Sequence, residues 1–120
     1  MLTIHVENFS DLAVVECKGR VVRSESVFKL RDAVLAQAPS RIIALDLSEV
    51  EAIGGGGLGM LVFLQRWARD HDIQLKLFSP SSSVVDGLGR IRPILSFEIP
   101  TLHEMMIILA HSDSRYALAA

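Results

Sequence analysis

The residues whose spacing could do chemistry lie in the run Gly54-Gly55-Gly56-Gly57-Leu58-Gly59. Gly54, Gly56 and Gly59 match G-x-G-x-x-G between a predicted strand and a predicted helix, the arrangement that holds a pyrophosphate in dinucleotide-binding folds. However, the run follows the third predicted strand, the next strand (73–78) has no acidic residue for a ribose, and 120 residues are too few for two nucleotide-binding halves. No Gly-Lys-Ser/Thr follows, so a P-loop is excluded. Binding of a nucleotide or small anion by the backbone amides stays open as an alternative.

The side chains that could act in catalysis form no recognisable constellation. The histidines are scattered, at positions His5, His71, His103 and His111. Cys17 lies in a predicted strand and is expected to be a small buried hydrophobe, and a lone cysteine builds neither an internal disulfide nor a cysteine-rich metal site. Asp46 could act as a general base, but the end of a buried strand favours a hydrogen bond to a following turn. We therefore predict no enzyme, no cofactor and no metal site.

Composition and charge narrow the function classes further. Half of the 120 residues are hydrophobic and 22% are charged, which is typical of one globular domain. A net charge of -2 argues against nucleic-acid binding, which needs a concentrated positive field. No apolar run reaches the ~20 residues that span a bilayer, so we expect no membrane insertion. Residues 1–7 alternate and carry charge, unlike a signal peptide, and a cytoplasmic location is the default expectation.

Hydrophobic periodicity predicts the elements that position these residues. Strands are expected at 2–7, 12–18, 41–47, 73–78 and 97–99, and helices at about 24–37, at 58–70, after the serines at 81–83, and from Thr101. The order β-β-α-β-α-β-α-β-α predicts a single α/β domain whose mixed, mostly parallel sheet of four or five strands is covered by about four helices. The domain should span 1–112, with 113–120 as a flexible tail.

The predicted helix after the glycines has two unequal faces. At ~100° per residue, one broad apolar face collects Met60, Leu61, Phe63, Leu64, Trp67 and Ala68. Leu58 and Val62 fall on the opposite, polar face with Arg66 and Arg69. They are either isolated surface hydrophobes, which are common, or the apolar anchor of a docking patch ringed by arginine.

Four segments of the chain together carry a resemblance to a known family. They are Gly19-Arg20-Val21-Val22, Leu45-Asp46-Leu47-Ser48-Glu49-Val50, Leu58-Gly59-Met60-Leu61 and Leu75-Lys76-Leu77-Phe78-Ser79-Pro80. In this order and spacing the chain resembles the STAS domain, in particular bacterial anti-sigma-factor antagonists, over nearly its whole length. The resemblance implies a regulator that binds a kinase-type anti-sigma factor and so releases a sigma factor.

The chain departs from that family at the strand–helix loop, which typically reads Asp-Ser-Ser-Gly-Leu-Gly. In the family the partner kinase phosphorylates the second serine, and ~2 negative charges at a helix N-terminus then break the complex. Here Gly57-Leu58-Gly59 aligns with Gly-Leu-Gly, so Gly54 replaces the aspartate, Gly55 the first serine and Gly56 the phosphoacceptor. Since Gly56 has no hydroxyl, this position cannot be phosphorylated.

Several hypotheses stay open at this point. The protein is an antagonist locked in its binding-competent state, a STAS module that recognises another protein, a binder of nucleotide or small anion through its glycines, or a fold whose switch has drifted or been engineered away. The expected contact surface comprises Gly54, Gly55, Gly56, Gly57, Leu58, Val62, Arg66, Arg69 and Ser48. We also expect a mobile glycine loop, a helix cap from the serines at 81–83, and a monomer or weak dimer.

Overall fold

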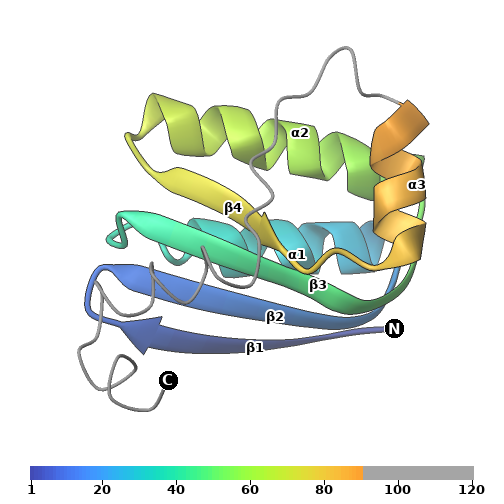
Figure 1. Cartoon of the computed structure of the whole chain (residues 1–120), viewed down its shortest axis with the longest axis horizontal. Coiled ribbons are helices and arrows are strands. Elements are labelled where there is room, and N and C mark those ends of the chain that lie inside the picture. The colour runs from blue at the N-terminus through green and yellow to red at the C-terminus, as the bar shows by residue number, and fades with distance from the viewer. Residues whose placement is uncertain (91–120) are drawn as a thin grey trace.

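The computed structural model describes residues 1–90 and is shown in Figure 1. Its strands are β1 (Leu2–Phe9), β2 (Leu12–Val21), β3 (Ile42–Ile53) and β4 (Gln74–Phe78), and its helices are α1 (Ser24–Leu35), α2 (Gly55–Asp70) and α3 (Ser82–Arg90). The strand predicted at 97–99, the helix predicted from Thr101 and the tail predicted at 113–120 lie outside the described residues.

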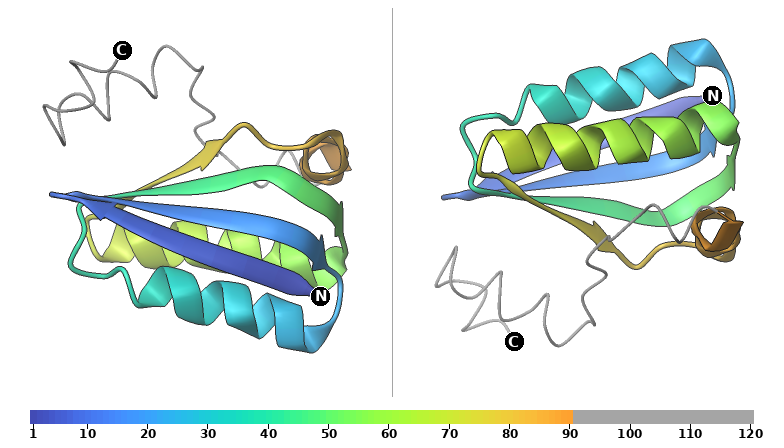
Figure 2. Two further views of the ribbon diagram at one scale, coloured as in Figure 1. Left: turned by 90° about the horizontal axis from the view of Figure 1, so that it is seen from below. Right: turned by 90° about the horizontal axis from the view of Figure 1, so that it is seen from above.

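The strands form one sheet in the order β1-β2-β3-β4. β1 pairs antiparallel with β2, whereas β2, β3 and β4 run parallel to their neighbours. The two parallel crossovers place α1 and α2 side by side on one face of the sheet, as Figure 2 shows. This arrangement confirms the predicted α/β class and mixed sheet.

The main core lies between the sheet and the layer of α1 and α2. Its fully buried side chains come from each of these elements and include Val15, Val34, Leu45, Leu47, Leu61, Leu64 and Leu77. Burying one such side chain contributes ~1.5–3 kcal/mol, so the helices are held mainly by this layer. A second, smaller cluster, of Leu12 and Ala44 with Phe9, Val14, Ile42 and Phe78 packed against them, occupies the other face of the sheet.

The third strand is longer than its sequence predicts. It continues past residue 47 to Ile53, and its pairing with β2 shifts register between Glu16 and Lys18 and again between Gly19 and Arg20. The predicted turn after Asp46 is therefore wrong, because the chain forms a bulge there and remains a strand. The predicted turn chemistry is nevertheless present: Asp46 Oδ1 accepts hydrogen bonds from Ser48 N at 3.0 Å and from Ser48 Oγ at 2.7 Å.

Candidate partner-binding site at the start of α2

The glycine run forms a strand end and a first helical turn instead of a loop. Gly54 is the extended N-cap of α2, and Gly55, Gly56 and Gly57 are its first residues. Gly54 N donates to the Val21 carbonyl at 3.0 Å, and Gly54 O accepts the first helical bond from Leu58 N, also at 3.0 Å. The predictions of a glycine loop and of a helix start at residue 58 are therefore wrong, since β2 holds the run at one end and the helix ladder holds it at the other.

Only one of these glycines is required by close packing. A Cβ on Gly57 would lie 2.7 Å from Ile53 Cγ1 and 2.8 Å from the Val21 carbonyl oxygen. By contrast, a Cβ on Gly56 would meet nothing nearer than Val27 Cγ2 at 3.7 Å, and one on Gly55 nothing within 4 Å. At Gly54 the nearest atom is Val22 Cα, again at 3.7 Å. The fold therefore has room for side chains at 54, 55 and 56, the positions that the resemblance assigns to Asp-Ser-Ser.

The predicted contact residues do not all lie together. Gly55 and Gly56 are exposed on the first turn, and Arg66 and Arg69 are also exposed. However, Arg69 follows Gly56 by ~20 Å of helix, at 1.5 Å rise per residue. Ser48 is exposed in the bulge of β3, where its hydroxyl donates to Asp46, and it precedes the glycines by ~20 Å of extended chain. The compact part of the site is therefore the helix start itself.

The predicted exposure of Leu58 is wrong. Leu58 is only 8% exposed, whereas Phe63, which its helical phase places on the inner face, is 46% exposed. The reason is α3, which lies over the start of α2: a Cβ on Gly87 would sit 2.9 Å from Leu58 Cδ2. Helical periodicity within α2 contains no information on α3, so it gives the inner face the wrong centre. Val62 is half-buried, between the two faces.

The sequence reasoning missed the exposure of two apolar residues, Val22 next to the start of α2 and Phe63 further along the helix. Val22, which directly follows β2, is 45% exposed, and a Cβ on Gly54 would lie 3.7 Å from its Cα. Gly56 faces Val27 of α1, and Phe63 lies seven residues further along the same stripe of α2. The available signal was the motif Gly19-Arg20-Val21-Val22, which already carried the resemblance. These side chains give the helix start an apolar border.

The serines after β4 anchor α3 to the bulged half of β3. Ser81 Oγ donates to the Val50 carbonyl at 2.6 Å and accepts from Val84 N at 3.4 Å, and Ser83 Oγ donates to the Glu51 carbonyl at 2.8 Å. The predicted helix cap is confirmed at Ser81. These bonds fix α3 where it covers Leu58, so they help to position the start of α2.

Within residues 1–90, the groups considered for catalysis make ordinary structural contacts, and His103 and His111 lie outside the described residues. His5 Nε2 lies 3.1 Å from Glu7 Oε1, and His71 Nδ1 lies 2.7 Å from the Trp67 carbonyl oxygen. Burial, with a smaller contribution from Asp46, raises the pKa of the Cys17 thiol to about 12, so the thiol stays protonated as predicted for a buried hydrophobe. Within residues 1–90, no group of three or more His, Cys, Asp or Glu could hold a metal ion. No helix of this part of the chain is long and apolar enough to cross a bilayer.

Comparison with protein families matches the chain to the STAS domain over residues 6–97. The chain is also 33% identical over 97 residues to the ATP-dependent Clp protease proteolytic subunit 1 of Prochlorococcus marinus. That alignment covers 81% of the chain, which spans only 48% of the protease subunit's length.

Solved structures of anti-sigma factor antagonists share the fold. An antagonist from Mycobacterium paratuberculosis superposes with a TM-score of 0.75 at 20% identity, covering 91% of this chain and 94% of its own. The antagonist SpoIIAA in its unphosphorylated form gives 0.72 at 13% identity, covering 91% and 97% of the two chains. A protein from Thermotoga maritima, described as an antagonist of the same kind, gives 0.72 at 19% identity, covering 88% and 93%.

Proposed function

The chain belongs to the STAS domain family, and on that premise we propose that it is a non-enzymatic interaction regulator of the anti-sigma-factor-antagonist type. Its partner is a kinase-type anti-sigma factor, which it binds in the cytoplasm through the start of α2 and so releases a sigma factor. The observation that carries the proposal is Gly56, which is exposed on the first turn of α2 at the position that matches the family's phosphoacceptor.

Because Gly56 has no hydroxyl, the proposed regulator stays in the unphosphorylated state, which is the one that binds the partner. A phosphate would add about −1.5 to −2 charges and three acceptor oxygens at this helix end. Gly56 cannot accept it, and its neutral surface matches an unmodified serine in charge. The complex is therefore expected to be insensitive to the kinase activity of the partner, unlike a complex that phosphorylation breaks.

The first experiment restores the switch. The Gly54→Asp/Gly56→Ser variant is incubated with the cognate kinase and ATP, and its intact mass is compared with that of the original chain. We expect one phosphate on the variant at position 56 and none on the original chain. Gly55→Ser is the matched control, since it adds a hydroxyl one residue away, where a side chain also has room. A phosphate on another serine of the original chain would refute the fixed state.

A second experiment tests the contact surface. The buried Leu58 is unsuitable for a charge substitution, because Leu58→Asp would disturb folding. Val62→Asp and Val22→Asp place the charge at half-buried and exposed positions instead, and Arg66→Ala tests the polar border. Intact binding of the kinase in all these variants would contradict the proposed surface while leaving the family assignment untouched.

Two alternatives, a small-anion ligand and a different protein partner, can be tested with the same protein. Nucleotides and inorganic phosphate are titrated against the protein by NMR. Saturable shifts confined to Gly54–Gly57 would favour a small anion held by the backbone amides. If no kinase partner binds and another regulatory protein does, the chain is a STAS module outside the sigma switch.

A further inference from the structure

We propose that β1 is a self-pairing edge, through which two copies of this chain form a symmetric dimer with a continuous sheet. No described strand lies beyond β1, which is the first strand of the sheet. Its pairing with β2 runs from Leu2 to Phe9 without a register shift, and it contains no proline. An edge that is regular, long and without proline is a template for another strand, here over the part of β1 beyond Leu2, whose carbonyl is bonded by Lys29.

Two hydrogen bonds show which residues of β1 point their backbone N–H and C=O groups toward β2 and which point them away. Arg20 N donates to the Met1 carbonyl at 3.2 Å, so that carbonyl faces β2. Lys29 Nζ donates to the next carbonyl, of Leu2, at 2.8 Å, from α1. Because alternate residues of a strand point their N–H and C=O groups to opposite sides, Ile4, Val6 and Asn8 direct theirs away from β2. These residues can form a ladder with a second β1.

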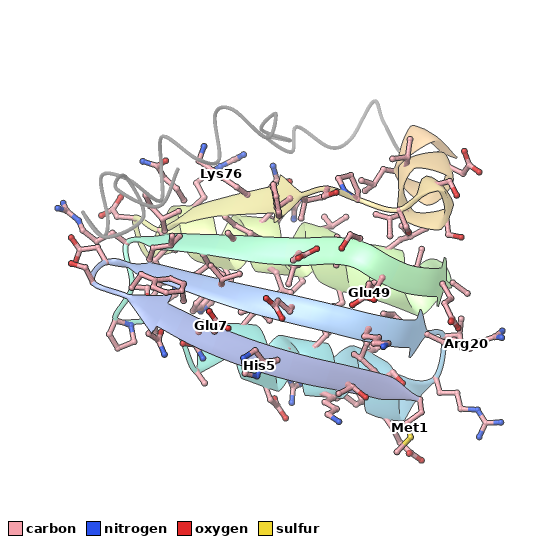
Figure 3. The ribbon with its side chains drawn as sticks, turned by 60° about the horizontal axis from the view of Figure 1, so that its bottom comes forward. Met1, His5, Glu7, Arg20, Glu49 and Lys76 are labelled. Carbon is pink, nitrogen blue, oxygen red and sulfur yellow. The ribbon has the colours of Figure 1, made fainter. Side chains whose placement is uncertain are left out.

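The side chains of His5 and Glu7 select the register of that ladder. Both lie on the sheet face away from α1 and α2, as Figure 3 shows, with side chains 64% and 45% exposed. In an antiparallel pair centred on Val6, each His5 stands opposite Glu7 of the other copy, and Ile4 is hydrogen-bonded to Asn8. An imidazole and a carboxylate directly across a strand pair can hydrogen-bond to each other, and this register provides two such pairs by symmetry, each in place of the His5–Glu7 contact within one strand.

The neighbouring registers are unfavourable. Centring the pair on His5 places two imidazoles opposite each other and requires the Leu2 carbonyl, which Lys29 already occupies. Centring it on Glu7 places two carboxylates opposite each other, and like charges directly across a pair are destabilising. The pair centred on Val6 thus uses the outward N–H and C=O groups of Ile4, Val6 and Asn8 and does not need the Leu2 carbonyl that Lys29 occupies.

The helix beside this edge leaves room for the second copy. A twofold axis perpendicular to the sheet brings α1 of both copies onto the same face. The flank of α1 that carries Lys29 continues with Ala33, four residues on, and with the C-cap Ala36 just after the helix. Small side chains on this flank allow the two copies of α1 to approach closely. Since α1 packs on both β1 and β2, the spacing of the strands places the two copies of α1 ~10 Å apart, which is an ordinary helix-packing distance.

Disulfide trapping tests the register on the full chain. His5→Cys and Glu7→Cys are made separately, and each variant is oxidised alone and as an equimolar mixture. Non-hydrogen-bonded partners lie ~4.5 Å apart between Cα atoms, which a disulfide can span. We expect a crosslinked dimer from the mixture at least tenfold above either variant alone. The native Cys17 is buried with a raised pKa and contributes no crosslink to a folded chain.

Sedimentation equilibrium tests the dimer without a crosslink. The chain should associate reversibly, and Val6→Pro should raise the dimer Kd at least tenfold. Since the Val6 N–H points outward, the proline leaves the β1–β2 ladder intact, which circular dichroism verifies. A chain that stays monomeric up to about 1 mM would overturn the proposal. So would crosslinking of His5→Cys or Glu7→Cys alone as efficient as that of the mixture, a result that stays decisive if Val6→Pro fails to fold.

Discussion

Gly57→Ala should destabilise the protein, although alanine is the better helix former. The added Cβ would lie 2.7 Å from Ile53 Cγ1, 2.8 Å from the Val21 carbonyl oxygen and 2.9 Å from Val21 Cγ1. Real Cβ atoms essentially never make contacts this short, and one of the neighbours is backbone. The start of α2 must therefore move away from β2 and β3 to accommodate one methyl group.

The magnitude follows from two opposing effects. Overpacking a well-packed site costs ~1–3 kcal/mol. Replacing glycine by alanine where the backbone permits it returns ~0.4–1 kcal/mol, through the reduced freedom of the unfolded chain. The net change at Gly57 is a loss of ~1–2 kcal/mol. At Gly56, where the nearest contact is 3.7 Å, the same substitution has only the favourable effect.

Urea unfolding of both variants and the original chain measures the difference. Gly57→Ala should lower the free energy of unfolding and Gly56→Ala should raise it, so the two variants differ by ~2 kcal/mol, or about 8 °C in Tm for a domain of this size. The pair is matched, because both residues lie in the first turn of α2. Equal stability of the two variants would refute the steric role of Gly57.

Three further predictions concern stability. The pKa of the Cys17 thiol is about 12 in the folded protein and 9.0 in the unfolded reference, so between these values only the unfolded chain loses the proton. The free energy of unfolding should therefore fall by ~1 kcal/mol between pH 9 and pH 10. Cys17→Ala should remove this part of the fall, as measured by urea titrations. Ser81→Ala should cost ~1–2 kcal/mol through its lost cap and carbonyl bonds, against little change for the exposed Ser82→Ala, by thermal unfolding. Gly54→Asp/Gly56→Ser should be at least as stable as the original chain, since both positions have room; a loss above ~1 kcal/mol would contradict this.

The order of elements could be predicted because each carries a strong local pattern. The apolar run Ile42-Ile43-Ala44-Leu45 reads as a strand buried on both faces, and it is the centre of the sheet. The length of β3 could not be predicted from that run, since Ser48 and Glu49 are turn-compatible residues that face solvent in a bulge. Their strand conformation comes from pairing with β2, a contact between distant segments that local propensity does not contain.

The start of α2 shows the same division between local and tertiary effects. Glycine disfavours a helix by ~1 kcal/mol per residue, which predicts a loop at Gly55–Gly57. The fold overrides this preference, because Gly57 lets the helix meet Ile53 and Val21 closely, and Gly54 is bonded to β2. The burial of Leu58 escapes prediction for a related reason: its cover, α3, is separated from it by a strand and a connection.

The packing of the fold thus requires only one of the four glycines at 54–57. Gly57 is explained by the fold alone, since it touches both neighbouring strands. Gly54, Gly55 and Gly56 are not, because each has space for a side chain and helical or extended backbone that any residue adopts. Glycine at the helical positions 55 and 56 lowers helix stability without a packing gain, and at the N-cap Gly54 it provides no side-chain hydrogen bond. The fold therefore does not account for these three residues, and the proposed function does: they leave uncharged backbone at a helix start, which the proposed partner would approach closely and a kinase would be unable to phosphorylate.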